Sequence, residues 1–253
     1  MTAAVVVLSK GLPTALVLLD LIAISKNVTV NTRGLIKDLA KLDNKTLCCI
    51  AVDRTIKEPT AVETWINEFP FLVNAPWHNI FKMTHQVSPE PYLQSFQYKV
   101  NNRILNCGVN LHKWKIKDTP LCSYCNDIDT IEHHLFYCAN NENFWYEISS
   151  WIGNIFGINI HQSFTVCEIL FGTAVDDNKF KPIQYCKNLI ILIGKWYINK
   201  TRSSNRPLNV QAFQKILKGK LEVYMNIIEK SDKNERVDED TKRCIQMIIQ
   251  NLL

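Results

Sequence analysis

Three cysteines and two adjacent histidines lie close together in the middle of the chain, in the stretch CSYCNDIDTIEHHLFYC that runs from Cys122 to Cys138. Cys122 and Cys125 form a C-x-x-C pair, whose short loop presents two thiolates to one ion. Cys138 supplies a third thiolate further along. Zinc takes about four nitrogen or sulfur ligands at roughly 2.0–2.3 Å in a tetrahedron. The order C-x2-C-x7-H-x4-C therefore predicts a zinc site of three cysteines and one histidine.

Two neighbouring histidines, His133 and His134, compete for the fourth ligand position. Adjacent side chains on a helix point about a third of a turn apart, so only one can face the ion. His133 stands at an H-x4-C interval, about one helical turn, which lays its imidazole over the Cys138 thiol. His134, at an H-x3-C interval that zinc sites also tolerate, is the alternative.

The ligands that we expect are therefore Cys122, Cys125, His133 and Cys138. Four protein ligands leave no open position on the ion, so the zinc would be structural and not catalytic. Two other interpretations of the same residues are a redox-active C-x-x-C pair and ordinary buried thiols beside surface histidines.

The other cysteines bear on the compartment. The chain has nine, an odd number, and they are scattered apart from this one group. Because a secreted disulfide framework is denser and even-numbered, we expect reduced thiols and an intracellular protein, nuclear or cytoplasmic.

The N-terminal stretch AAVVVLSKGLPTALVLLDLIAI is apolar, but Lys10, Pro13 and Asp20 interrupt it. A membrane helix needs about 18–20 apolar residues in a row. We expect a buried segment and no membrane association. A signal peptide or membrane span, and an artefactual or truncated start, are the alternatives.

Helical spacing of apolar residues dominates the chain and predicts a mostly α protein: a helical scaffold with a small zinc-binding module of cysteines and histidine in its middle. Residues 32–47 show this spacing, and FTVCEILF is ambiguous between strand and helix. We expect a helical, apolar N-terminal segment over residues 1–58 and a main region over 59–229, with the zinc module at about 118–146. A charged linker and a short C-terminal helix then occupy 230–253.

A longer stretch around the cysteines, FQYKVNNRILNCGVNLHKWKIKDTPLCSYCNDIDTIEHHLFYC followed by FW, resembles the zinc-binding region that follows the polymerase domain in LINE-type (non-LTR) retrotransposon reverse transcriptases. The matching marks are Phe96-Gln97-Tyr98, Asn102-Arg103-Ile104-Leu105, Lys113-Trp114, Pro120-Leu121-Cys122 with Cys125, Thr130-Ile131-Glu132-His133, Cys138 and Phe144-Trp145.

This resemblance covers roughly residues 59–229. The family's histidine stands five places before the last cysteine, which maps to His133. The resemblance implies a C-terminal fragment of a retroelement polyprotein, or a gene descended from one, and an association with template RNA.

Catalytic patterns are weak. A polymerase holds its metal ions with an Asp pair between strands and a further carboxylate upstream. The Asp pair here, Asp176-Asp177, lies downstream of the cysteines and is followed by polar NKFKP, which is typical of a solvated turn. Cys107 near His112 lacks an evident orienting partner. We expect no catalysis by this chain alone; an enzyme with a hidden site is the rival hypothesis.

The segment from Tyr92 to Lys117 contains no Asp or Glu. Basic side chains in it are Lys99, Arg103, Lys113, Lys115 and Lys117, and aromatic ones are Tyr92, Phe96, Tyr98 and Trp114. Cations that follow phosphates and rings that stack on bases bind single-stranded nucleic acid, and RNA suits such a platform better than duplex DNA.

The same segment has a plainer interpretation, because helical spacing places Phe96 and Val100 in the core. We predict that RNA or another single-stranded nucleic acid binds through Lys99, Arg103, Lys113, Trp114, Lys115 and Lys117. The alternative is a zinc-stapled structural or protein-interaction module.

Overall fold

The computed structural model describes residues 29–32, 35–38, 59–157, 164–173, 182–230 and 237–252. The chain divides into two compact units, Met1–Glu58 and Pro59–Leu253. The apolar stretch at the N-terminus and the Asp176-Asp177 pair lie outside the described residues.

In the first unit, the described residues form an antiparallel pair of strands, β1 (Thr29–Thr32) and β2 (Leu35–Asp38). The register pairs Thr32 with Leu35. This corrects the helix expected to begin at residue 32, as far as Asp38. The physical reason lies in the β-branched residues of both strands, which fit a pleated strand better than a helix. Residues 39–58 lie outside the described part.

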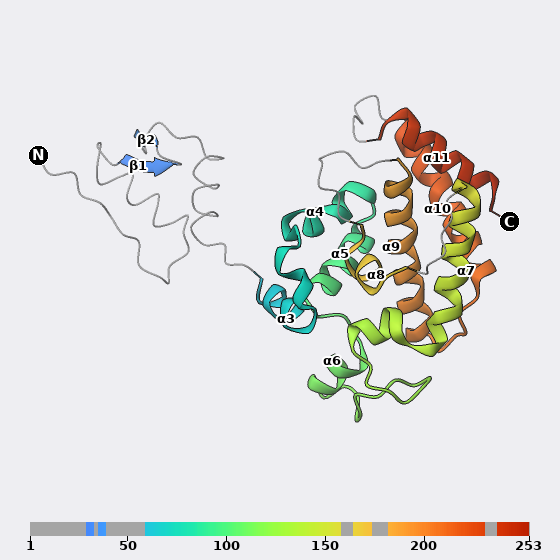
Figure 1. Cartoon of the computed structure of the whole chain (residues 1–253), viewed down its shortest axis with the longest axis horizontal. Coiled ribbons are helices and arrows are strands. Elements are labelled where there is room, and N and C mark those ends of the chain that lie inside the picture. Colours follow the sequence, from blue (N-terminus) through green and yellow to red (C-terminus); the bar gives the residue numbers. More distant parts are fainter. Residues whose placement is uncertain are drawn as a thin grey trace, which may run out of the picture. The chain divides into compact units, whose positions relative to one another are not determined.

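The second unit is helical in its described residues, which confirms the mostly α expectation (Figure 1). Its elements are α3 (Thr60–Glu68), η2 (Pro70–Asn74), α4 (Trp77–Val87), α5 (Pro91–Asn101), α6 (Gly108–Lys113), η3 (His133–Tyr137), α7 (Ala139–Phe156), α8 (Val166–Phe171), α9 (Pro182–Ser203), α10 (Val210–Lys230) and α11 (Glu239–Gln250).

Helix α9 is the central element of this unit, with α4, α5 and α8 on one side and α7, α10 and α11 on the other (Figure 1). Its middle is apolar on every face, and each residue from Leu189 to Ile193 is buried. A helix without a polar face must be enclosed by its neighbours. Gly194 lets α7 pack closely against α9, since a Cβ at this position would lie 2.9 Å from the Trp145 ring.

Two short elements refine the expectations. The ambiguous FTVCEILF contains helix α8, which begins at a capping box between Thr165 and Glu168. Helix α11, whose Ile245 and Ile248 are buried, packs on α9 and α10. The C-terminal helix therefore belongs to the second unit, although the sequence predicted a separate segment over residues 230–253. Across the described residues, no helix is both long and apolar enough to span a bilayer.

Candidate metal centre

Cys122, Cys125, His133 and Cys138 converge at one point, where one possible ligand atom from each lies within 4.8 Å of all the others. The Sγ of Cys138 is 3.8 Å from that of Cys122 and 3.9 Å from that of Cys125. The Nε2 of His133 is 3.2 Å from the Sγ of Cys125. This arrangement is compatible with a metal site.

A tight hairpin turn presents the C-x-x-C pair. An isolated antiparallel bridge between Leu121 and Ile128 closes its base. Within the turn, Asn126 adopts the left-handed conformation (φ 63°), which Asn tolerates better than most residues. The backbone N–H of Tyr124 points at the Cys122 Sγ, 3.4 Å away. The turn therefore supplies a donor to a sulfur as well as two thiols.

The short π-helical turn η3 supplies the other two side chains. The Cys138 N–H donates to the His133 carbonyl oxygen at 3.0 Å, an i to i+5 bond. The Thr130 hydroxyl accepts from the His133 N–H at 3.2 Å and fixes the start of the turn. A π-turn contains one residue more than an α-turn, so residues five apart face the same way. Single π-turns often occur at functional sites.

The neighbouring His134 is not part of this group and contacts Asp129 instead. Its Nδ1 lies 3.2 Å and 3.3 Å from the two carboxylate oxygens of Asp129, and the ring is buried. His133 was predicted as the ligand on the assumption of an ordinary helical turn, in which residues four apart align best. That geometry would have favoured His134. The π-turn is what brings His133 to the cysteines.

The pKa values of two of the cysteine thiols, Cys122 and Cys125, are shifted in opposite directions. Burial opposes ionisation of Cys122, but the Tyr124 N–H, His133 and Arg202 outweigh it and lower its pKa to about 6. Burial, together with the sulfurs of Cys122 and Cys138, raises the pKa of Cys125 to about 12. Neighbouring thiolates repel, so this cluster holds several negative charges only beside a cation.

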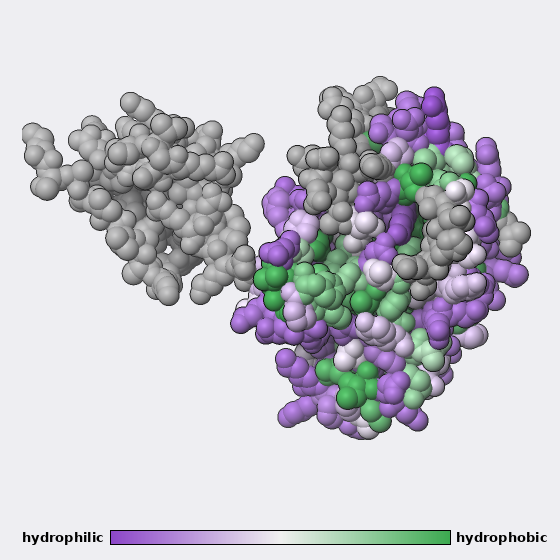
Figure 2. Space-filling view, viewed as in Figure 1, coloured by the Kyte–Doolittle hydropathy of each residue, from purple (hydrophilic) through white to green (hydrophobic). Residues whose placement is uncertain are grey.

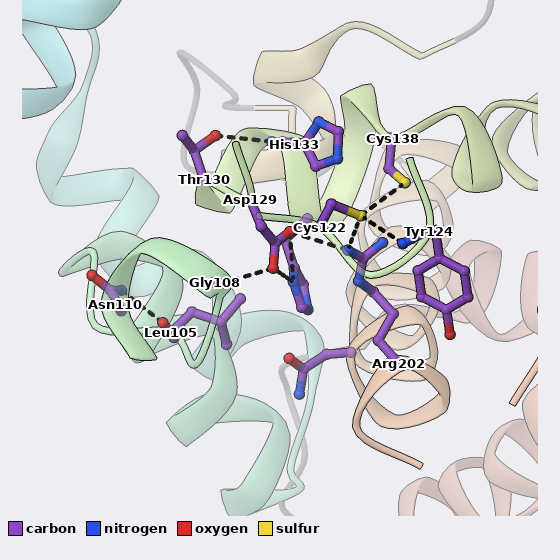
Figure 3. A network of polar contacts seen from close by, with 12 residues as sticks. Leu105, Gly108, Asn110, Cys122, Tyr124, Asp129, Thr130, His133, Cys138 and Arg202 are labelled. Atoms are coloured by element: carbon purple, nitrogen blue, oxygen red, sulfur yellow. Dashed lines mark hydrogen bonds and ion pairs between the residues drawn. The ribbon is translucent and has the colours of Figure 1, made fainter. Parts of the chain in front are cut away.

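The carboxylate of Asp129 connects the cluster to the rest of the unit (Figure 3). It accepts a 2.7 Å hydrogen bond from the Gly108 N–H at the start of α6, and a 3.1 Å bond from Arg202 at the end of α9. Arg202 also donates to the Cys122 Sγ at 3.0 Å. Gly108, Asp129 and Arg202 could not be predicted as part of the site, because no local spacing links them to the cysteines.

Most of the predicted nucleic-acid contacts lie at the end of α6 and on the short segment after it. Lys113, Trp114 and Lys115 are exposed, and Ile116 beside them is 71% exposed. The Lys117 ammonium donates to the Leu121 carbonyl oxygen. In Figure 2, hydrophobic residues show at the end of the unit where α6 lies in Figure 1. Lys99 is exposed on α5.

Arg103 does not belong with these residues, which corrects the sequence expectation. Its guanidinium makes two 2.7 Å contacts with Glu68 and a 2.9 Å contact with Glu132, and it lies 4.0 Å from the centre of the Trp65 ring. Two carboxylates from other elements contact its Nη1 and Nη2 groups. Arg103 therefore joins α3 to the region before η3, and a phosphate would have to compete with these carboxylates.

Two of the aromatic residues are also engaged inside the unit. Phe96 is buried, as its helical spacing suggested, and Tyr92 packs against Trp196 with ring centroids 5.4 Å apart.

The Cys107 thiol is buried, and burial raises its pKa to about 11. A protonated thiol of this kind is a poor nucleophile.

Comparison of the chain with known protein-family models, curated proteins and solved structures gives no match. The geometry of the site is therefore the basis for interpreting it.

Proposed function

We propose that the second unit is a zinc-stapled module that binds single-stranded RNA and has no catalytic role. The observation that carries this proposal is the position of the exposed segment Lys113–Lys117, which is fixed to the Cys/His cluster through α6. Gly108 N–H and Val109 N–H both donate to Asp129, to its side chain and its backbone respectively. Asp129 lies between the C-x-x-C hairpin and η3.

Zinc suits the distances between the ligand atoms. A tetrahedral ion with sulfur ligands at about 2.3 Å places them roughly 3.8 Å apart. The measured sulfur separations are 3.8 Å and 3.9 Å. A nitrogen ligand at about 2.05 Å would lie roughly 3.5 Å from a sulfur, slightly further than the 3.2 Å between Cys125 and His133. Three thiolates and an imidazole are ligands that zinc prefers.

RNA suits the exposed segment. Lys113 and Lys115 flank Trp114, which is 41% exposed. No Asp or Glu is adjacent to these two lysines in the sequence. Ammonium groups contact phosphates and an indole face stacks on a base. The resemblance of the cysteine region to LINE-type reverse transcriptases favours RNA as the partner. It also suggests that this chain is a fragment of such a polyprotein, or descends from one, without the polymerase or endonuclease sites.

The zinc part of the proposal is tested by metal analysis of the purified protein. We expect one zinc per chain, and its loss in Cys122→Ser, Cys125→Ser or Cys138→Ser. Structural zinc contributes about 10–16 kcal/mol of apparent binding energy in finger peptides, so chelation should unfold at least this module. Protein that contains no metal and is unaffected by chelators would contradict the zinc site.

The RNA part is tested by fluorescence anisotropy with a labelled single-stranded RNA of mixed sequence at several salt concentrations. We expect Lys113→Gln/Lys115→Gln to weaken binding and to flatten the log–log salt dependence by up to about 1.4, since each phosphate contact contributes roughly 0.7. A matched control, Lys200→Gln/Lys215→Gln, removes two exposed lysines from α9 and α10. The control should bind like the unmodified protein.

A zinc-stapled protein-interaction module is the second candidate. Ile116 and Ile128 are 71% and 59% exposed on the same module, and aliphatic side chains contact proteins more readily than they stack on bases. Protein that retains its zinc and shows no RNA affinity at low salt would favour this candidate over the first.

A further inference from the structure

Arg202 reaches the metal centre from the far end of α9. Its side chain is 5% exposed, and its Nη2 donates to the Cys122 Sγ at 3.0 Å and to the Asp129 carboxylate at 3.1 Å (Figure 3). The guanidinium carbon lies 5.0 Å from the centre of the Tyr124 ring. Tyr124 in turn contacts the Arg206 carbonyl oxygen through its hydroxyl, at 3.4 Å.

Charge gives this contact a role. Zn²⁺ with three thiolates and a neutral imidazole carries a net charge of −1, and the Asp129 carboxylate beside it adds another. A buried negative charge is costly unless a cation or several hydrogen-bond donors compensate it. The Arg202 guanidinium provides both, since it keeps its charge at all ordinary pH values and presents N–H groups in a fixed plane.

We infer that Arg202 is a positioning residue of the metal centre: it holds the Cys122 thiolate in its ligand geometry and fastens the zinc module to the end of α9. This inference rests on the proposed zinc site. Donors outside the ligand set typically change metal affinity about 10- to 100-fold when they are removed. Arg202 thus acts on the metal through Cys122 and is not itself a ligand.

The obvious rival is that Arg202 only packs the module against α9, through Asp129 and Tyr124. The two roles differ in what they do to the sulfur. A hydrogen bond and a nearby positive charge stabilise the electrons of the thiolate, so their loss should lower the energy of sulfur-to-metal charge transfer. Loose packing at a distance from the sulfur would leave that transition unchanged.

Three variants of the full chain separate these roles. Arg202→Met removes the charge and the donors at similar length. Arg202→Lys keeps the charge but replaces the planar pair of donors by one ammonium, which cannot serve two acceptors with the same geometry. Lys200→Met is the matched control, because Lys200 is exposed in the last turn of the same helix.

Each variant is titrated with zinc against a chromophoric chelator, and its absorption spectrum is recorded after replacement of zinc by Co²⁺. We expect Arg202→Met to weaken zinc binding about 10- to 100-fold and to move the sulfur-to-cobalt band to longer wavelength. Arg202→Lys should fall between Arg202→Met and the unmodified protein in affinity. Lys200→Met should match the unmodified protein in both measurements.

Unchanged affinity and an unchanged band in Arg202→Met would overturn the inference, as would weaker affinity with an unchanged band, which indicates packing alone. Should Arg202→Met fail to fold, Arg202→Lys decides, and values equal to those of the unmodified protein would overturn the inference. Failure of the zinc site itself is a separate result, since the unmodified protein would then show neither zinc nor a cobalt band.

Discussion

The backbone N–H of Gly108 donates a 2.7 Å hydrogen bond to the buried carboxylate of Asp129. There is no space at Gly108 for a side chain. A Cβ on Gly108 would lie 2.6 Å from the Pro120 carbonyl oxygen and 2.7 Å from the Asp129 Cβ. Both neighbours flank the Leu121–Ile128 bridge at the base of the C-x-x-C hairpin. Gly108 is therefore a point at which α6 and the base of this hairpin come into close contact.

Gly108→Ala should separate these two elements. We expect a loss of about 1–3 kcal/mol in the free energy of unfolding, the usual cost of an overpacked site. Urea denaturation measures it. The control is Gly219→Ala on α10, where a Cβ meets nothing within 4 Å and alanine should stabilise the helix by up to about 1 kcal/mol. Equal effects of the two substitutions would contradict the tight contact at Gly108.

His133→Ala and His134→Ala should differ in zinc affinity. The first removes a side chain that lies 3.2 Å from the Cys125 Sγ, so we expect a large loss of affinity. The second removes one of the partners of Asp129 and should lower stability while one zinc per chain is retained. Metal analysis together with thermal unfolding distinguishes the two effects. A larger zinc loss in His134→Ala would assign the ligand position to that residue.

Lys195 should make stability depend on pH. This lysine is fully enclosed on α9, and its ammonium group donates to the side-chain oxygen of Gln97 and the carbonyl oxygen of Leu170. Burial lowers its pKa from 10.5 to about 7. Above about pH 7 the unfolded chain binds the proton that the folded chain has lost. The contribution of Lys195 to the free energy of unfolding therefore rises with pH above about pH 7.

Lys195→Met tests that dependence. Between about pH 7 and 8.5, the free energy of unfolding of the unmodified protein should gain on that of the variant by up to about 1.4 kcal/mol per pH unit. Methionine fills much of the same space without a charge, so we expect the variant to be the more stable of the two near pH 7. A constant difference between the two proteins across this range would show that Lys195 does not change protonation there.

Trp114→Ala should weaken RNA binding without changing its salt dependence, because stacking is not an ionic contact. The loss should be about 1–3 kcal/mol for one stacked base. Tyr146→Ala is the control, since Tyr146 is 63% exposed on α7, outside the Lys113–Lys117 segment. Anisotropy titrations at several salt concentrations measure both quantities. A flatter salt slope in Trp114→Ala would indicate that the substitution disturbs the lysines.

The sequence predicted what neighbouring residues determine. Cysteines three apart share a turn in almost any fold, so Cys122 and Cys125 could be paired from their spacing. Helical periodicity likewise predicted a mostly α protein with a short C-terminal helix. The strand β2 was mistaken for the start of a helix, because a few apolar residues fit either period.

Contacts between distant parts of the chain could not be predicted in this way. Arg103 stands in a segment without acidic residues, yet Glu68 and Glu132 reach it from 35 and 29 residues away. Arg202 meets Cys122 across 80 residues. The absence of local acidic residues therefore says little about which charges are free, because the packing of distant parts of the chain determines it.

The 80-residue separation of Arg202 from Cys122 also sets an order of events during synthesis. A ribosome releases the N-terminal part of a chain first, at about 5–20 residues per second. All four metal-site side chains thus leave it several seconds before Arg202 does. An ion bound by the nascent chain at the proposed site would at first lack the arginine, whose contribution begins only when the end of α9 arrives. At the proposed zinc site, Arg202 would therefore affect how long a finished molecule keeps the ion, rather than whether a growing one acquires it.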